Sequence, residues 1–171
     1  MRRGEHVQKQ EKEYYPLIKA KLEELLRTKS TNFYFEITAN KKFSDKLKAE
    51  IREGRDIIFQ FLKEASPDIT GFIKNKYSSD FIVVEFKRGR IKLDDIYQAR
   101  KYKDLFGAKF AFLVSLESVP EEIKRLHKVI YPLLSSPGTY EAFVLVHFNE
   151  ESGEFKEWYP ENPCEKGLYW K

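Results

Sequence analysis

The sequence contains a single cysteine, Cys164, and a single methionine among its 171 residues. One thiol excludes an internal disulfide framework and a zinc site built from cysteines. The sequence also lacks an apolar run long enough to span a membrane, and residues 1–4 lead straight into polar sequence rather than into a signal peptide. We therefore expect a cytoplasmic protein.

Several common catalytic patterns are missing as well. The three histidines, His6, His127 and His147, stand far apart with no metal-ligand spacing between them. No Walker loop or GxGxxG sequence occurs, so nucleotide hydrolysis and dinucleotide binding have little support. Ser115 and Cys164 have no base near them in any defensible pattern. We interpret His127 and His147 as structural residues.

The composition is that of one globular domain with a real core, because 42% of the residues are hydrophobic and 34% are charged. Lys and Glu are abundant, a bias that has been reported for hyperthermophile proteins. The net charge of +4 is unevenly spread, since residues 141–171 hold three Lys and seven Glu. The positive remainder of the chain favours a polyanionic substrate, although charge runs also mark ordinary solvated faces.

Two short apolar segments in the middle of the sequence each carry one acidic residue, and pairing of the segments would bring the two acids together. Residues 66–73 (SPDITGFI) predict a strand with Asp68 near its start, and residues 81–87 (FIVVEFK) predict a strand with Glu85 near its end. The short polar loop 74–80 joins the two segments into a hairpin. We therefore expect Asp68 to lie near Glu85 across the pair.

The second of these strands ends in two charges of opposite sign, Glu85 and Lys87, which share one face because side chains alternate along a strand. Two carboxylates supply the hard oxygen ligands that suit Mg²⁺. A lysine beside the metal can position or deprotonate an attacking water. The simpler alternative is that Asp68 caps a turn and that Glu85 and Lys87 form a surface ion pair.

Pro67-Asp68 followed by Glu85-Phe86-Lys87 resembles the motif of the PD-(D/E)xK nuclease superfamily. The resemblance covers roughly residues 11–116 and implies an α/β, restriction-endonuclease-like fold. That fold has an αβββαβ core with a mixed central sheet, here with one inserted helix and a C-terminal β-hairpin. Residues 1–171 would form a single domain, in which 117–171 add a helix and the hairpin.

The resemblance also implies roles for individual residues. Asp68, Glu85 and the backbone carbonyl of Phe86 would hold Mg²⁺, for which Mn²⁺ would substitute. Lys87 would orient the nucleophilic water and stabilise charge that develops at phosphorus. In many members the first helix supplies a glutamate, and Glu11 stands on the apolar stripe of the first predicted helix. The alternative for Glu11 is a plain N-terminal acid favoured by the helix dipole.

A helix is predicted over residues 93–106, with Asp94 and Asp95 at its N-terminus. Within it, Gln98 and Tyr102 form a Gln-x-x-x-Tyr pattern just after the Glu-x-Lys strand, which resembles the RecB-like branch of these nucleases; an archaeal resolvase-like branch is the other candidate. The alternative is an ordinary amphipathic helix in which Tyr102 packs and Gln98 is incidental.

Periodicity predicts the remaining elements. Residues 109–116 form an apolar strand that we expect to be central and parallel to a neighbour. The other expected elements are a helix from about Glu11, a strand at 32–39, an inserted helix at 45–65, a helix at 121–134 and a hairpin of strands 140–148 and 154–159.

These observations predict a Mg²⁺-dependent nuclease that hydrolyses phosphodiester bonds, with DNA a better partner than RNA, no membrane partner and a homodimer left open. The expected phosphate contacts are the basic side chains Arg88, Arg90, Lys92, Lys101 and Lys103. The alternative is a catalytically inactive module of the same fold that binds nucleic acid or a protein partner. A third interpretation is an unrelated α/β binding domain.

Overall fold

The computed structural model describes residues 8–130, 132–134, 140–165 and 170. Its centre is a six-stranded sheet in the order β1-β2-β3-β4-β5-β6. The strands are β1 (Phe33–Ile37), β2 (Ile69–Lys74), β3 (Ser79–Lys87), β4 (Phe110–Ser115), β5 (Ala142–Asn149) and β6 (Glu154–Tyr159). The pairs β3–β4 and β4–β5 are parallel and the other three are antiparallel. The predicted α/β class, mixed sheet and C-terminal hairpin are confirmed.

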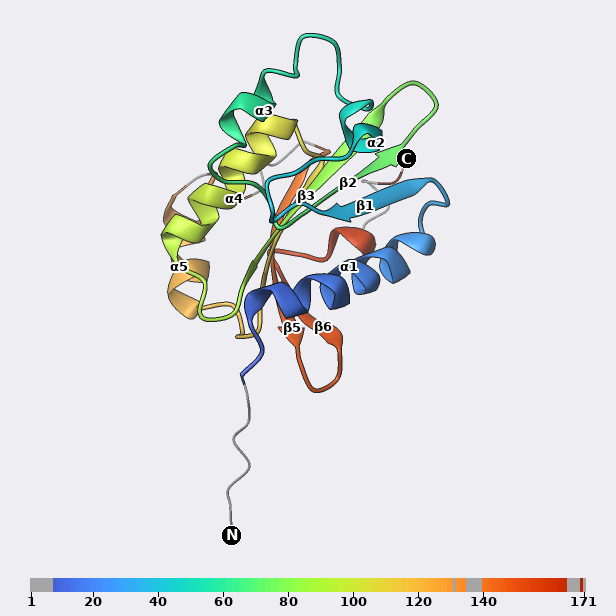
Figure 1. Cartoon of the computed structure of the whole chain (residues 1–171). Helices are drawn as coiled ribbons and strands as arrows, with labels where there is room; N and C mark the ends of the chain where they lie inside the picture. The colour runs from blue at the N-terminus through green and yellow to red at the C-terminus, as the bar shows by residue number, and fades with distance from the viewer. Residues whose placement is uncertain (1–7, 131, 135–139, 166–169, 171) are drawn as a thin grey trace.

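Helices cover both faces of this sheet (Figure 1). One face packs against α1 (Glu11–Arg27) through buried residues such as Tyr14, Ile18 and Leu22. The other face packs against α4 (Leu93–Phe106), α5 (Glu121–Val129) and the short helices α2 (Asp45–Lys48) and α3 (Ile58–Phe61). The alternation of side chains along β3 therefore sends Val84 and Phe86 toward α1, and Val83 and Glu85 toward α4.

The connection from β3 to β4 fixes where the carboxyl ends of the central strands lie. Helix α4 begins and ends at the residues that the sequence predicts, and Gly107 ends it with a positive φ of 58°. Because β3 and β4 are parallel, α4 runs back along the sheet, and its N-terminus lies beside the end of β3. Among the described helices, none has both the length and the apolarity needed to cross a membrane.

The prediction of a single inserted helix over residues 45–65 is wrong. The structure has two four-residue helices, α2 and α3, joined by turns and bends. Gly54, with a φ of 83°, lies in the left-handed region that an α-helix does not use. Buried Leu47, Ile58 and Leu62 still produce the apolar spacing that suggested one helix.

The helix predicted over 121–134 is too long, because α5 ends at Val129. Its C-cap, Ile130, already has the extended angles φ −108° and ψ 116°. Pro132 follows closely and has no N–H to continue a helix. Residue 131, which falls within the predicted helix, lies outside the described residues.

Candidate functional site

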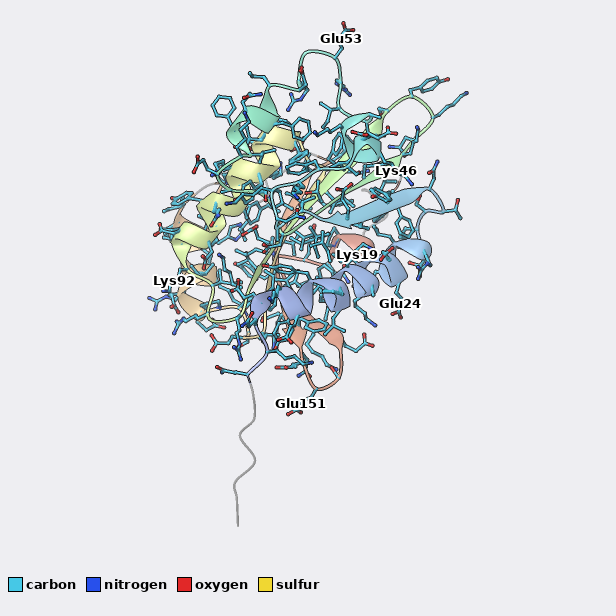
Figure 2. The ribbon with its side chains drawn as sticks, in the orientation of Figure 1. Lys19, Glu24, Lys46, Glu53, Lys92 and Glu151 are labelled. Carbon is cyan, nitrogen blue, oxygen red and sulfur yellow. The ribbon has the colours of Figure 1, made fainter. Side chains whose placement is uncertain are left out.

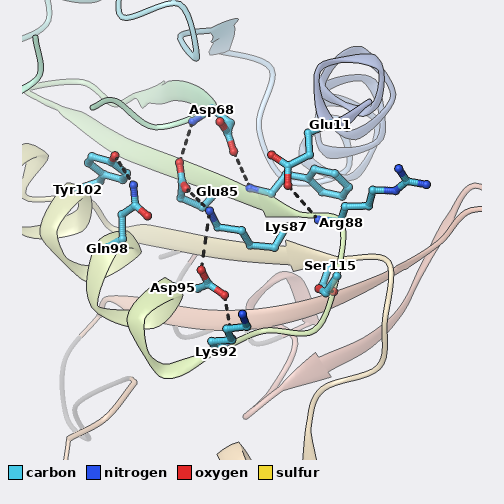
Figure 3. A network of polar contacts seen from close by, with 12 residues as sticks. Glu11, Asp68, Glu85, Lys87, Arg88, Lys92, Asp95, Gln98, Tyr102 and Ser115 are labelled. Atoms are coloured by element: carbon cyan, nitrogen blue, oxygen red, sulfur yellow. Dashed lines mark hydrogen bonds and ion pairs between the residues drawn. The ribbon is translucent and has the colours of Figure 1, made fainter. Parts of the chain in front are cut away.

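The register of the β2–β3 hairpin brings the two predicted acids together. Ile69 pairs with Val84, so Asp68, one residue before β2, lies opposite Glu85. The Asp68 N–H donates to Glu85 Oε1 over 3.2 Å, and the Phe86 N–H donates to Asp68 Oδ2 over 2.8 Å. Figure 3 shows the two carboxylates next to one another beside β3. The expected proximity of Asp68 and Glu85 is confirmed.

Burial makes this pair electrostatically unfavourable. Glu85 is only 5% exposed. Burial, and then the neighbouring charge of Asp68, raise the pKa of Glu85 to about 9, against a smaller opposing effect of Lys87. Burial also raises the pKa of Asp68 to about 6, although the hydrogen bonds from Phe86 and Tyr15 oppose the shift. The fold therefore holds two carboxyl groups where adding negative charge is costly.

Lys87 lies between two carboxylates at the end of β3. Its Nζ is 4.0 Å from Glu85 Oε2 and 3.8 Å from Asp95 Oδ1, and its side chain is 29% exposed. Asp95 is fixed in turn, because its Oδ2 accepts the Lys92 N–H over 2.8 Å at the start of α4. From the sequence, Asp95 is expected only at the helix N-terminus. Its spacing of three residues before Gln98 is the signal that places both side chains on one face of α4.

Helix α1 contributes two side chains to the edge of the site. Glu11 is exposed, and its Oε1 accepts the Arg88 N–H over 3.3 Å. Its charge is one of the smaller causes that raise the pKa values of Asp68 and Glu85. Tyr15, one helical turn later, hydrogen-bonds through its hydroxyl to the Asp68 carboxylate. Tyr15 also belongs to the core cluster on this face of the sheet, and the sequence gives no sign of its contact with Asp68.

The predicted Gln-x-x-x-Tyr pair faces the same site from α4. Gln98 Nε2 donates to the Tyr102 hydroxyl over 3.0 Å, and Tyr102 is fully buried. Burial is the main cause of the raised pKa of Tyr102, and the charges of Glu85 and Asp68 add to it. The pair therefore lies in the field of the carboxylates. The partners of Lys87, however, are Glu85 and Asp95 rather than Gln98 and Tyr102.

A buried set of hydroxyl groups holds the backbone that carries Asp68. Thr38 and Thr70 are both fully buried, and their hydroxyl oxygens are 2.8 Å apart. The Thr38 hydroxyl donates to the Pro67 carbonyl over 2.6 Å, and Ser66 Oγ donates to the Thr38 carbonyl over 2.6 Å. Buried and satisfied hydrogen bonds of this kind restrict the local backbone to one conformation.

The donor set fits a hard divalent cation. Among the described residues, no three His, Cys, Asp or Glu side chains converge closely enough to hold a metal by themselves. Mg²⁺, however, is usually held by one or two carboxylates together with water and substrate oxygens. Asp68 and Glu85 supply the carboxylates. The Phe86 carbonyl lies on the same side of β3 as its N–H, which points at Asp68.

The predicted phosphate contacts divide into two groups. Arg88 is half-buried, and Arg90 and Lys92 are exposed on the turn after β3, where Figure 2 labels Lys92. The Arg90 guanidinium forms an ion pair with Glu122. Lys101 is exposed on α4, whereas Lys103 Nζ lies 2.6 Å from Glu141 Oε2, just before β5 and at the opposite end of the parallel strands. The structure therefore does not bring Lys103 to the carboxylates.

Comparison with known proteins finds no matching family model, no matching curated protein and no matching solved structure. The chemistry of this site is therefore inferred from the geometry of Asp68, Glu85 and Lys87 and from their surroundings.

Proposed function

We propose that this protein is a divalent-cation-dependent nuclease that hydrolyses phosphodiester bonds in DNA. The observation that carries the proposal is a pair of adjacent carboxylates, half-buried Asp68 and buried Glu85. Their pKa values are raised, and they lie beside Lys87 at the end of a strand. A bound Mg²⁺ or Mn²⁺ would supply the positive charge that this pair lacks and would polarise a phosphate oxygen.

The side chains around the pair have distinct tasks in this proposal. Lys87 is long and partly exposed, so its ammonium group can donate hydrogen bonds to the attacking water or to a phosphate oxygen. Asp95 and Glu85 keep that ammonium group at the mouth of the site. Glu11, at the rim, is placed to accept a hydrogen bond from a water molecule that approaches the carboxylates.

The buried neighbours hold these groups in position. Tyr15 and the Phe86 N–H both donate to the Asp68 carboxylate and so fix its orientation. Tyr102 and Gln98 close the α4 side of the site with a hydrogen-bonded pair. Arg88, Arg90 and Lys92 provide positive charge next to Lys87, which suits contacts with phosphates flanking the bond that is cut.

The proposal is tested by incubating the protein with labelled single-stranded, duplex and branched DNA and with RNA, in Mg²⁺, Mn²⁺ or EDTA. The matched variant is Lys87→Met, which keeps the apolar stem and removes the ammonium group. We expect metal-dependent cleavage by the wild type and a loss of turnover of about a hundredfold or more in Lys87→Met, with substrate binding retained.

Three results would count against parts of this account. Cleavage that persists in EDTA would contradict the metal dependence. Single-turnover cleavage by Lys87→Met at the wild-type rate would remove the lysine from the mechanism. No cleavage of any substrate would replace the enzyme with a module that only binds nucleic acid or a protein partner.

A further inference from the structure

A second basic turn, residues 39–42, is attached directly to the backbone of Asp68. The N–H groups of Thr38 and Ala39 both donate to the Asp68 carbonyl, over 2.8 and 3.2 Å. The chain then turns back, with the Lys41 N–H donating to the Thr38 carbonyl over 2.9 Å. The Lys42 N–H donates to Asn40 Oδ1 over 3.0 Å. We call residues 39–42 the Lys41 turn.

The backbone of the Lys41 turn is sterically unfavourable for the residue that occupies it. Lys41 has a φ of 65° and is the single non-glycine residue with a positive φ in the described part of the chain. This left-handed conformation suits glycine or asparagine, because a Cβ crowds the backbone there. Local strain of this kind tends to be kept where the side chain has a function.

The two lysines of the Lys41 turn carry uncompensated charge. Both side chains are exposed, and within the described ranges neither ammonium group forms an ion pair. Arg90 and Lys103, by contrast, are paired with Glu122 and Glu141. The Lys41 turn is thus an exposed positive surface attached to the backbone of Asp68.

The far end of the Lys41 turn is also anchored. The Ser44 N–H donates to Glu36 Oε2 over 3.0 Å, and Ser44 Oγ accepts the Leu47 N–H over 3.1 Å at the start of α2. Hydrogen bonds to Asp68 on one side and to Glu36 on the other hold the turn in a fixed shape. A preorganised turn loses less freedom when a ligand binds.

Resting on the proposed function, we infer that the Lys41 turn binds backbone phosphates of the substrate strand on the side of Asp68 and Glu85 opposite to residues 88–92. The order across the sheet supports this placement, because the Lys41 turn follows β1, while the Gly89 carbonyl accepts from Ser115 of β4 over 2.8 Å. The two turns are three strand spacings apart, roughly 14 Å. About four nucleotides of a strand cover that distance at 3.4 Å each.

The test is the affinity for a fluorescein-labelled 16-nucleotide single strand and its duplex, measured by anisotropy in EDTA at several salt concentrations. The variant Lys41→Gly/Lys42→Ala removes both charges and also relieves the left-handed backbone at position 41. We expect its salt slope, log K against log [salt], to fall by about 1.4 to 1.8, the value for two phosphate contacts. Its melting temperature should be no lower than that of the wild type.

The matched control is Lys76→Ala, an exposed lysine in the loop at the other end of β3, whose removal should leave the salt slope unchanged. An equal decrease in Lys76→Ala would overturn the inference, because it would show a general charge effect. An unchanged slope in Lys41→Gly/Lys42→Ala, together with a decrease in Arg88→Glu/Lys92→Glu, would overturn the inference and leave the proposed function standing. No detectable binding of either probe by the wild type would overturn both.

Discussion

Carboxylates lie at both ends of the β2–β3 hairpin, and their pKa values are shifted in opposite directions. At the end where β3 begins, Glu50 lies 3.0 Å from Lys74 Nζ and 2.5 Å from Ser79 Oγ. The hydrogen bond from Ser79 is the main cause that lowers the pKa of Glu50, and Lys74 adds to it against an opposing effect of burial. At the other end, burial raises the pKa values of Asp68 and Glu85.

Burial at one end and the hydrogen bond from Ser79 at the other are the main causes of this difference, and the nearest cations add to it. Lys74 Nζ lies 3.0 Å from Glu50 Oε1, which is hydrogen-bond distance. Lys87 Nζ lies 4.0 Å from Glu85 Oε2 and 3.8 Å from Asp95 Oδ1. The charge of Glu50 is therefore compensated within the protein by Lys74 and Ser79. The Asp68 end leaves one buried acid, Glu85, and one half-buried acid, Asp68, without enough positive charge. This is the arrangement expected where a cation and a substrate complete the site.

The largest expected difference between the two ends is in cleavage. Glu85→Gln should reduce metal-dependent cleavage by at least about a hundredfold, because it removes a charge that the reaction centre uses. Glu50→Gln makes the same change at the other end of β3 and should leave the rate within about twofold of wild type. Single-turnover assays measure both. Equal losses in the two variants would contradict the assignment of the chemistry to the Asp68 end of the hairpin.

The same two variants should change the stability of the metal-free protein in opposite directions. Glu85→Gln removes an acid that is costly to ionise, so the free energy of unfolding at pH 8 should rise by about 1 to 3 kcal/mol. Glu50→Gln loses a partly exposed ion pair and should lower that free energy by about 0.5 to 1 kcal/mol. Urea unfolding in EDTA gives both values. A decrease in Glu85→Gln would show that Glu85 is already well compensated.

The pH dependence of the metal-free protein sharpens the comparison further. The folded-state pKa of Glu85 is raised from 4.5 to about 9, so between these values the folded state binds more protons than the unfolded state. Its contribution to stability is fully present below about pH 4.5 and is lost as the pH rises toward 9. We expect the free energy of unfolding in EDTA to fall by at most about 1.4 kcal/mol per pH unit between pH 6 and 8. Glu85→Gln should flatten this slope, and Glu50→Gln should keep it.

Asp95→Asn should reduce cleavage less than Glu85→Gln does. Removing the charge that competes for Lys87 lets the ammonium group move toward Glu85. The pH slope of metal-free stability should become shallower than in the wild type, and cleavage should fall by about tenfold, less than in Lys87→Met. An unchanged slope would show that Lys87 does not move closer to Glu85 in this variant.

Much of the fold is predictable from local patterns in the sequence. The apolar spacing and the terminal acids place α4 at its observed bounds, and the alternation in 81–87 places Glu85 and Lys87 on one face. Asp68 meets Glu85 because a short hairpin allows few registers. The same reasoning fails between residues 45 and 65. There, buried Leu47, Ile58 and Leu62 reach the core from two short helices and their caps rather than from one long helix.

The residues that the sequence analysis missed enter the site through packing between distant elements. Tyr15 reaches Asp68 because α1 lies across β3, and nothing near position 15 indicates that. Asp95 contacts Lys87 because α4 begins beside the end of β3. The turn at Lys41 could not be predicted for another reason, because a lysine does not indicate the left-handed conformation that it adopts there.

The most direct test of the central claim is the change in melting temperature when Mn²⁺ or Mg²⁺ is added to the metal-free protein. At a cation concentration 100-fold above Kd, binding should raise the melting temperature of the wild type and of Glu50→Gln by roughly 5–10 °C. Asp68→Ala and Glu85→Ala should lose this shift while remaining folded. A full wild-type shift in Glu85→Ala would contradict the account, because the cation would then bind elsewhere.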